Sequence, residues 1–319
     1  MRPIAVDAMG GDRAPAEIVA GAHQAAEAGI PVVLVGPSEL EGRGDLPLIV
    51  ASEVIAMEED PARGVRRKKD STLVRAAEAV RDGEASAMIS AGNTGATMAA
   101  ALLRMGRIKG VSRPAVATPI PVMGSSPTIL LDAGANAEVQ PEWLVQFAQM
   151  GSVYARHRFG LDAPRVGLLS IGEEPGKGDT LRKDTFRLLQ AAPGIDFIGN
   201  IEGRDIMSDR VDVAVTDGFT GNVVLKTLEG GVRAIIGTLL EVFGRPENQP
   251  HAEALLPSLM PMYRALDPDT YGGAVLLGVE GVCIISHGST GATAMFNAIN
   301  VAKDLVDHHI VDELRRAVV

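Results

Sequence analysis

Short apolar runs alternate along the chain with segments of helical periodicity. The runs expected to form strands lie at 4–6, 31–35, 48–50, 87–89, 128–131, 165–170, 196–198, 211–215 and 282–286. The segments expected to form helices lie at 16–28, 71–82, 94–104, 141–159, 291–307 and from 218 onward. Continuously apolar strands are typical of a sheet covered on both faces, and their alternation with helices favours parallel pairing. The sequence therefore predicts a three-layer α/β/α fold with a mostly parallel sheet.

No Gly/Ser linker, charge block or internal repeat divides the chain, so residues 1–319 are expected to form one large α/β unit. A segment near 245–270 stands out, because polar loops flank a group of apolar residues there. This group consists of Leu255, Leu256, Leu259, Met260, Met262, Tyr263 and Leu266. Pro257 and Pro261 argue against a regular helix through them. The excursion is expected to pack on its own core or on a second subunit, which is the commoner use of such residues, or to form an amphipathic tip that touches lipid.

Composition narrows the class of protein. The 319 residues are 46% hydrophobic and 22% charged, which is ordinary for a globular protein and excludes disorder as the main state. Forty acidic and 30 basic side chains give a net charge of −10, which argues against a general nucleic-acid binder. Asp7 and Asp12 interrupt the N-terminal apolar segment, and no apolar run reaches the roughly 18 residues of a membrane span. The sequence thus favours a cytoplasmic protein with at most peripheral membrane contact.

Four glycine-containing loops follow predicted strands, at 7–12, 90–96, 132–136 and 217–222. In an open α/β sheet, ligands bind outside the carboxyl ends of the strands. Glycines there let backbone N–H groups approach an anion at a helix N-terminus. Each loop alone is better explained as a tight turn with an Asn or Thr helix cap. The four together predict a phosphate or nucleotide site.

Other familiar motifs are missing from the sequence. There is no G-x-G-x-x-G, and the glycine spacing of 172–180 is a residue short of a P-loop, so we expect a mobile loop with Lys177 as an anion ligand. The single cysteine, Cys283, lies in a buried-strand pattern typical of a small hydrophobe. His287 follows a strand, where it is either a proton donor or a structural residue. No H-x-x-x-H or Cys/His cluster indicates a transition metal.

One basic cluster interrupts this acidic chain. It consists of Arg63, Arg66, Arg67, Lys68 and Lys69. A charge run of this kind is usually a solvated face. It is also a candidate docking patch for an acidic partner, with one or two side chains turned to an anionic substrate.

Several motifs taken together resemble bacterial phosphate acyltransferases, the acyl-[acyl carrier protein]:phosphate acyltransferases of phospholipid synthesis. They lie at 4–12, 90–96, 131–136, 170–174, 199–203, 216–223 and 286–288, in the family's order along nearly the whole chain. The resemblance implies a fold similar to those of isocitrate/isopropylmalate dehydrogenases and phosphotransacetylases, a homodimer, and no redox cofactor. It also implies that inorganic phosphate attacks the thioester of a long-chain acyl carrier protein. The acyl phosphate would then pass to a membrane-bound glycerol-3-phosphate acyltransferase.

Motif position within this resemblance assigns candidate roles. The expected phosphate cradle comprises Asn93, Thr94, Thr220, Gly221 and Asn222, with Lys226 one helical turn beyond. The expected proton donor or orienting group is His287 or Asp217. Further expected substrate contacts are Gly10, Gly11, Lys69, Arg113, Asn136 and Lys177. Because acyl carrier proteins are themselves acidic, docking is expected at the local basic face of 63–69.

The implied chemistry needs no covalent acyl-enzyme. Phosphate is itself a usable nucleophile and a thioester is an activated acyl donor, so positioning and charge stabilisation can supply most of the catalysis. Three alternatives stay open: a phosphotransacetylase-like enzyme that uses coenzyme A thioesters, a metal- and nicotinamide-dependent dehydrogenase, and a non-catalytic scaffold for acyl carrier protein. The dehydrogenase would need Asp ligands and a Lys/Tyr pair, for which the sequence offers no convincing set. The scaffold would not need four anion-suited loops.

Overall fold

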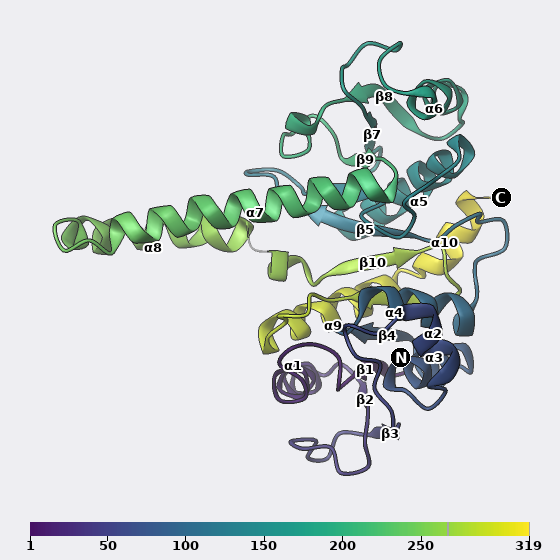
Figure 1. The fold of residues 1–319 in the computed structure, drawn as a ribbon, viewed down its shortest axis with the longest axis vertical. Coiled ribbons are helices and arrows are strands. Elements are labelled where there is room, and N and C mark those ends of the chain that lie inside the picture. The colour runs from purple at the N-terminus through teal and green to yellow at the C-terminus, as the bar shows by residue number, and fades with distance from the viewer. Residues whose placement is uncertain (267, 319) are drawn as a thin grey trace.

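The computed structural model describes residues 1–266 and 268–318, and its centre is a single sheet of 11 strands (Figure 1). The strand order is β3-β2-β1-β4-β11-β10-β5-β6-β9-β7-β8. The strands are Ile4–Asp7 (β1), Val32–Gly36 (β2), Leu48–Val50 (β3), Ala87–Ser90 (β4), Ala115–Ile120 (β5), Thr128–Leu131 (β6), Arg165–Leu169 (β7), Asp196–Ile201 (β8), Val213–Val215 (β9), Ala274–Leu277 (β10) and Val282–Ile285 (β11). The α-helices are Ala16–Glu27 (α1), Pro61–Arg67 (α2), Thr72–Arg81 (α3), Thr94–Ala100 (α4), Pro141–Phe159 (α5), Thr180–Ala191 (α6), Gly218–Phe243 (α7), Gln249–Leu266 (α8), Ala292–Asp307 (α9) and Ile310–Ala317 (α10).

The sheet is mostly parallel, as predicted, but its two halves run in opposite directions. Strands β1, β2, β3, β4 and β11 are parallel to one another, and so are β6, β7, β8 and β9. Between these halves, β10 is antiparallel to both β11 and β5, and β5 is antiparallel to β6. The carboxyl ends of β1, β4 and β11 therefore lie at the opposite end of the strands from those of β6 and β9.

Two hydrophobic layers cover the two faces of the sheet. Successive residues of β1 alternate between them, with Ile4 and Val6 in one layer and Ala5 in the other. Helices α1, α5, α9 and α10 pack in the first layer, and α2, α3 and α4 pack in the second, together with the first turns of α7. This double coverage confirms the three-layer arrangement and explains why the strands are apolar throughout.

Helices α7 and α8 form a hairpin that projects from the body of the molecule (Figure 1). Helix α8 continues through Pro257 and Pro261, so the expectation that these prolines prevent a regular helix was wrong. The two prolines are four residues apart and so lie on the same side of the helix. Packing against α7 supplies stability that the missing backbone hydrogen bonds do not. Within the described part of the chain, no helix has both the length and the apolarity needed to cross a bilayer.

Capping residues in the sequence predicted several helix ends correctly. Helix α5 begins with Pro141 in its first turn and ends at Gly160, which has the left-handed φ of +67° that suits glycine. Ser71 stands at the N-cap of α3, although its hydroxyl makes no capping bond. The sequence did not identify β5 and β10 as strands. Pro119 lies within β5, and proline lowers strand propensity because it cannot donate to the ladder.

Candidate active site

The structure divides the predicted site residues between two ends of the sheet. The β1 loop cluster comprises loops 8–13, 91–94 and 286–290, which follow β1, β4 and β11. The β9 loop cluster comprises loop 132–140, which follows β6, and segment 216–222, which follows β9 and includes the first turn of α7. Each loop follows the carboxyl end of its strand, as predicted. They do not form one ring, because β10 and β5 reverse the strand direction between them.

In the β1 loop cluster, three loops converge on Gly11. A Cβ added to Gly11 would lie 3.1 Å from the Cβ of Ala91 and 3.1 Å from the carbonyl oxygen of Gly288. The backbone N–H of Asp12 donates to that same carbonyl at 2.8 Å. The φ of Gly11 is +108°, a backbone conformation that L-residues with a side chain rarely adopt. Gly11 thus allows loops from three strands to meet.

The buried carboxylate of Asp7, at the end of β1, holds the loops of this cluster in place through hydrogen bonds. Its carboxylate accepts from the backbone N–H of Met9 at 3.1 Å and from the hydroxyl of Ser90 at 2.7 Å. The Ser90 oxygen in turn accepts from the N–H of Gly92 at 2.9 Å. Burial raises the pKa of Asp7, and these hydrogen bonds only partly oppose that rise. A Cβ on Gly10 would lie 2.6 Å from the Asp7 carboxylate, so Gly10 serves close packing here.

Of the predicted phosphate ligands in this cluster, Asn93 is committed to the protein itself. Its side-chain oxygen caps α4 by accepting from the N–H of Ala96 at 3.0 Å. Its amide nitrogen lies within hydrogen-bond distance of the carbonyls of Ala56, Met57 and Glu59, at 3.2, 2.9 and 3.1 Å. Thr94, by contrast, is exposed at the start of α4. The cap role that the sequence left open for Asn93 is the one observed.

The exposed ionisable side chains of the β1 loop cluster are Asp12, Arg13 and His287. The Nδ1 atom of His287 lies 2.8 Å from the hydroxyl oxygen of Ser289. The sequence analysis missed Arg13, which follows the Gly10-Gly11 loop. A Cβ added to Gly291 would lie 3.4 Å from Nη1 of Arg13, so this guanidinium lies against the start of α9. Across the described residues, no ion pair neutralises Arg13.

In the β9 loop cluster, Asp132 organises the loop that follows β6. One carboxylate oxygen accepts from the N–H groups of Val116, Gly134 and Ala135 at 3.0, 3.1 and 2.9 Å. The other accepts from the backbone and side-chain amides of Asn136, at 2.7 and 2.8 Å. Burial raises the pKa of Asp132, while these donors favour its ionised form. The predicted ligand Asn136 is therefore a structural partner of Asp132.

Gly221 allows the start of α7 to pack directly on this loop. A Cβ at Gly221 would lie 1.9 Å from the carbonyl oxygen of Asp132, and one at Gly218 would lie 2.7 Å from the carbonyl oxygen of Asn136. Neither position leaves room for a side chain. These glycines therefore serve the close approach of helix and loop.

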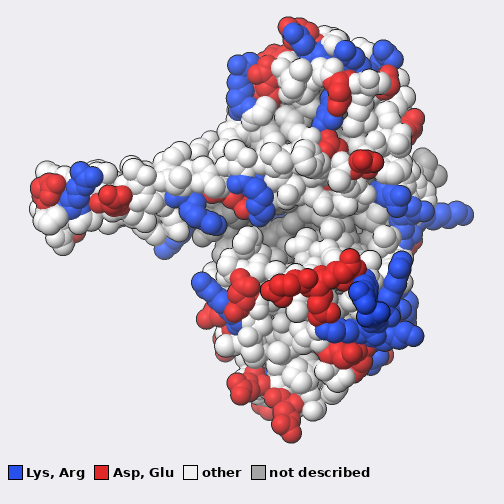
Figure 2. All heavy atoms as spheres, viewed as in Figure 1, with Lys and Arg blue, Asp and Glu red and all other residues white. Residues whose placement is uncertain are grey.

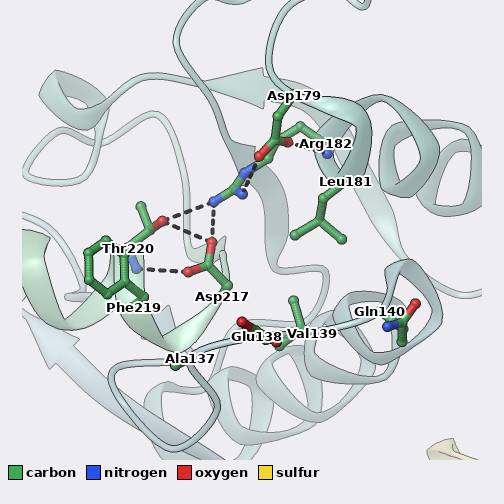
Figure 3. A pocket seen from close by; sticks show the side chains of 10 residues that line it. All are labelled: Ala137, Glu138, Val139, Gln140, Asp179, Leu181, Arg182, Asp217, Phe219 and Thr220. Atoms are coloured by element: carbon green, nitrogen blue, oxygen red, sulfur yellow. Dashed lines mark hydrogen bonds and ion pairs between the residues drawn. The ribbon is translucent and has the colours of Figure 1, made fainter.

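A partly buried ion pair joins α6 to α7 (Figure 3). Asp217 caps α7 by accepting from the N–H and the hydroxyl of Thr220, both at 2.8 Å, and it pairs with the guanidinium of Arg182. Arg182 also donates to the Thr220 hydroxyl at 3.1 Å and to Asp179 at 3.1 Å. Burial acts to raise the pKa of Asp217, but the bonds from Thr220 and the charge of Arg182 outweigh it, so the pKa is lowered. The sequence analysis missed Arg182, because its partner lies 35 residues away.

A cavity of about 490 Å³ opens above this ion pair. It is lined by Ala137, Glu138, Val139, Gln140, Asp179, Leu181, Arg182, Asp217, Phe219 and Thr220 (Figure 3). The carboxylates of Glu138, Asp179 and Asp217 line it together with the single guanidinium of Arg182. A phosphate dianion would meet net negative charge in this cavity. In the β1 loop cluster, by comparison, the exposed guanidinium of Arg13 follows the exposed carboxylate of Asp12 in the chain and forms no ion pair among the described residues.

The remaining predicted ligands are exposed. Asn222 and Lys226 are exposed on α7, where Lys226 pairs with Glu229 at 2.8 Å. Arg113 precedes β5, and its guanidinium carbon lies 5.0 Å from the ring centre of Trp143. Lys177 is exposed in the loop before α6, and Lys69 is exposed just after α2.

Comparison with solved structures defines the fold class. The chain superposes on a phosphotransacetylase from Streptococcus pyogenes with a TM-score of 0.63 and 17% identity, covering 96% of this chain and 94% of that one. The EutD phosphotransacetylase from Staphylococcus aureus gives 0.61 at 15% identity, with the same coverage. A putative 4-hydroxythreonine-4-phosphate dehydrogenase from Salmonella typhimurium gives 0.54 at 12% identity, covering 96% and 99%. The expected likeness to phosphotransacetylases is thus confirmed, and a dehydrogenase shares the fold.

Sequence comparison then identifies the family. Residues 2–313 match the family model described as "Fatty acid synthesis protein". A relative named phosphate acyltransferase from Desulfitobacterium hafniense (strain Y51) is 49% identical over 327 residues, covering 99% of this chain and 97% of the relative. Another of that name, from Pelotomaculum thermopropionicum, is 48% identical and covers 99% and 94%. The chain belongs to the phosphate acyltransferase family of lipid synthesis, which confirms the resemblance drawn from its motifs.

Proposed function

We propose that this enzyme transfers a long-chain acyl group from acyl carrier protein to inorganic phosphate, in the cytoplasm and without a redox cofactor. An oxygen of phosphate attacks the thioester carbonyl carbon, and the bond from carbon to sulfur breaks. The departing thiolate of the carrier takes up a proton, which leaves acyl phosphate and free acyl carrier protein. Family membership and a fold shared with phosphotransacetylases support this reaction class.

The observation that carries the choice of site is the exposed guanidinium of Arg13, which forms no ion pair among the described residues, whereas the guanidinium of Arg182 is paired with Asp217. In the β1 loop cluster, Arg13 is exposed and unpaired within the described residues, and His287 and Thr94 are exposed beside converging backbone loops. In the cavity beside the β9 loop cluster, three carboxylates line the wall together with one paired guanidinium. We assign phosphate binding to Arg13 and Thr94, and protonation of the leaving thiolate to His287. A positioned guanidinium is well suited to phosphate oxygens and to a developing oxyanion.

Direct attack by phosphate is favoured over an acyl-enzyme. Cys283 is fully buried on β11, and burial raises the pKa of its thiol to about 12, so it is neither accessible nor ionised near neutral pH. Phosphate is itself a usable nucleophile, so the reaction does not require ionisation of this thiol. The enzyme's contribution is then orientation and charge stabilisation.

The α7–α8 hairpin suits a lipid product. Large apolar side chains are exposed along it, including Ile235 at 64%, Leu240 at 55% and Leu255 at 52%. We propose that the protein works as a homodimer and that this hairpin either packs on the second copy or makes peripheral membrane contact, close to the membrane-bound glycerol-3-phosphate acyltransferase that would take the product. Flotation of the purified protein with liposomes, with Leu255→Asp as the altered tip, separates lipid contact from packing between copies.

A second candidate function is acyl transfer between coenzyme A and phosphate, which the phosphotransacetylase fold favours. The deciding assay supplies purified protein with phosphate and either long-chain acyl carrier protein or the matching acyl coenzyme A. Phosphate-dependent release of free carrier with formation of acyl phosphate is expected. Turnover with coenzyme A donors alone would favour the second candidate, and no acyl phosphate from either donor would leave a carrier-binding scaffold.

A further inference from the structure

Helix α2 presents a concentrated positive face in an otherwise acidic protein. Arg63, Arg66 and Arg67 are spaced i, i+3 and i+4, so they lie on one side of the helix, while Gly64 and Val65 are buried on the other. Lys69 follows directly and is also exposed. We call Arg63, Arg66, Arg67 and Lys69 the α2 basic face. Figure 2 shows a cluster of basic atoms at the place that α2 occupies in Figure 1.

The fifth cation of this segment, Lys68, has a different role. Its ammonium lies 2.5 Å from a carboxylate oxygen of Glu59 and 2.7 Å from the carbonyl oxygen of Val54. Lys68 therefore ties α2 to the preceding loop and cannot serve freely in docking. The four residues of the α2 basic face have no recorded ion pair within the described chain. Folding does not account for keeping four like charges together, because exposed like charges repel one another.

The α2 basic face is fixed next to the β1 loop cluster. A Cβ added to Gly95 would lie 2.6 Å from the ring of Pro61, so the start of α2 touches the start of α4. The amide of Asn93 holds the carbonyls of the 56–59 loop, which leads into α2. A partner seated on α2 is thus positioned relative to the loops that would receive its thioester.

We infer that the α2 basic face is the docking surface for the acidic carrier protein that delivers the acyl group. This inference rests on the proposed function, which requires an acidic protein partner at a protein whose net charge is −10. Carboxylates on the carrier would meet four unneutralised cations, which steers encounter and fixes orientation. The pantetheine arm would then reach across the start of α4 to Thr94 and His287.

The test is the double charge reversal Arg66→Glu with Arg67→Glu. The KM for acyl carrier protein should rise about tenfold or more, while kcat and the KM for phosphate stay within twofold. The control is Lys183→Glu with Arg187→Glu on α6, which changes the net charge equally on two exposed residues and should leave the carrier KM unaltered. Arg66→Lys with Arg67→Lys should restore most of the loss. Added salt should raise the carrier KM of the unaltered protein and flatten the difference between variants.

Four results would overturn the inference. The carrier KM could stay unchanged in the α2 reversal, the α6 control could raise it equally, or the α2 reversal could weaken only binding to vesicles of anionic phospholipid. A fall in kcat together with a raised KM for phosphate would also count against it, because that pattern indicates a disturbed β1 loop cluster. Failure of the proposed function itself is distinct, since the unaltered protein would then form no acyl phosphate from acyl carrier protein.

Discussion

The Arg182–Asp217 pair permits a test of which loop cluster carries the reaction. The two side chains are 11% and 7% exposed, so Arg182→Ala leaves a carboxylate with little access to water. Removing one partner of a buried pair costs about 3–5 kcal/mol. Asp217 keeps its two bonds from Thr220, so we expect the lower end, about 3 kcal/mol of unfolding free energy. Arg187→Ala, on the same helix, removes an exposed pair with Asp184 and should cost no more than about 0.5 kcal/mol.

The assay combines urea unfolding with turnover measured well below the transition. If the β1 loop cluster binds phosphate, Arg182→Ala should unfold at lower urea yet retain kcat/KM within about threefold, because Arg182 then acts only on stability. The pKa of Asp217 is lowered in the folded protein, so its contribution to stability is present above its unfolded pKa of about 3.9 and is lost as pH falls through the lower folded value. The stability gap between Arg182→Ala and the unaltered protein should therefore narrow below about pH 4. Turnover lost by orders of magnitude at unchanged stability would refute this reasoning and place the chemistry in the cavity.

Three further changes separate the roles assigned to other residues. Arg13→Ala should raise the KM for phosphate at least about tenfold without lowering the melting temperature, since the residue is exposed and unpaired in the described chain; an unchanged KM would remove it from the site. Cys283→Ala should keep full turnover while losing about 1 kcal/mol of stability from the small buried cavity, and a dead but folded variant would argue for thiol chemistry. Lys68→Gln should lower thermal stability and leave the relative affinities for carrier and phosphate alone, in contrast to reversal of the α2 basic face.

Much of the fold could be predicted from the sequence, because buried strands are continuously apolar and caps such as Pro141 and Gly160 act locally. The direction of the strands could not be predicted in this way. Hydrophobic periodicity is the same for parallel and antiparallel pairs, and the reversal depends on β10 and β5, which the pattern did not reveal. The sequence therefore could not show which of the predicted loops share an end of the sheet. The sequence could have identified Arg13, since it is a cation beside a predicted glycine loop. The contact between Arg182 and Asp217, by contrast, depends on how α6 packs on α5, β7 and β8.

The geometry gives segment 217–222 a structural role at the start of α7. Asp217 caps α7, and Gly221 lets the helix touch Asp132 where no side chain would fit. Helix α7 has 26 residues, so it extends about 39 Å from this point and carries α8 at its far end. A helix of that length, packed on the sheet only through its first turns, needs a firmly anchored N-terminal end. Arg182 anchors this end by donating hydrogen bonds to the cap residue Asp217 and to Thr220. The resemblance of this segment to a phosphate loop thus follows from the needs of helix anchoring, since glycines, an Asp cap and a Thr hydroxyl satisfy a buried helix start in the same way that they satisfy an anion.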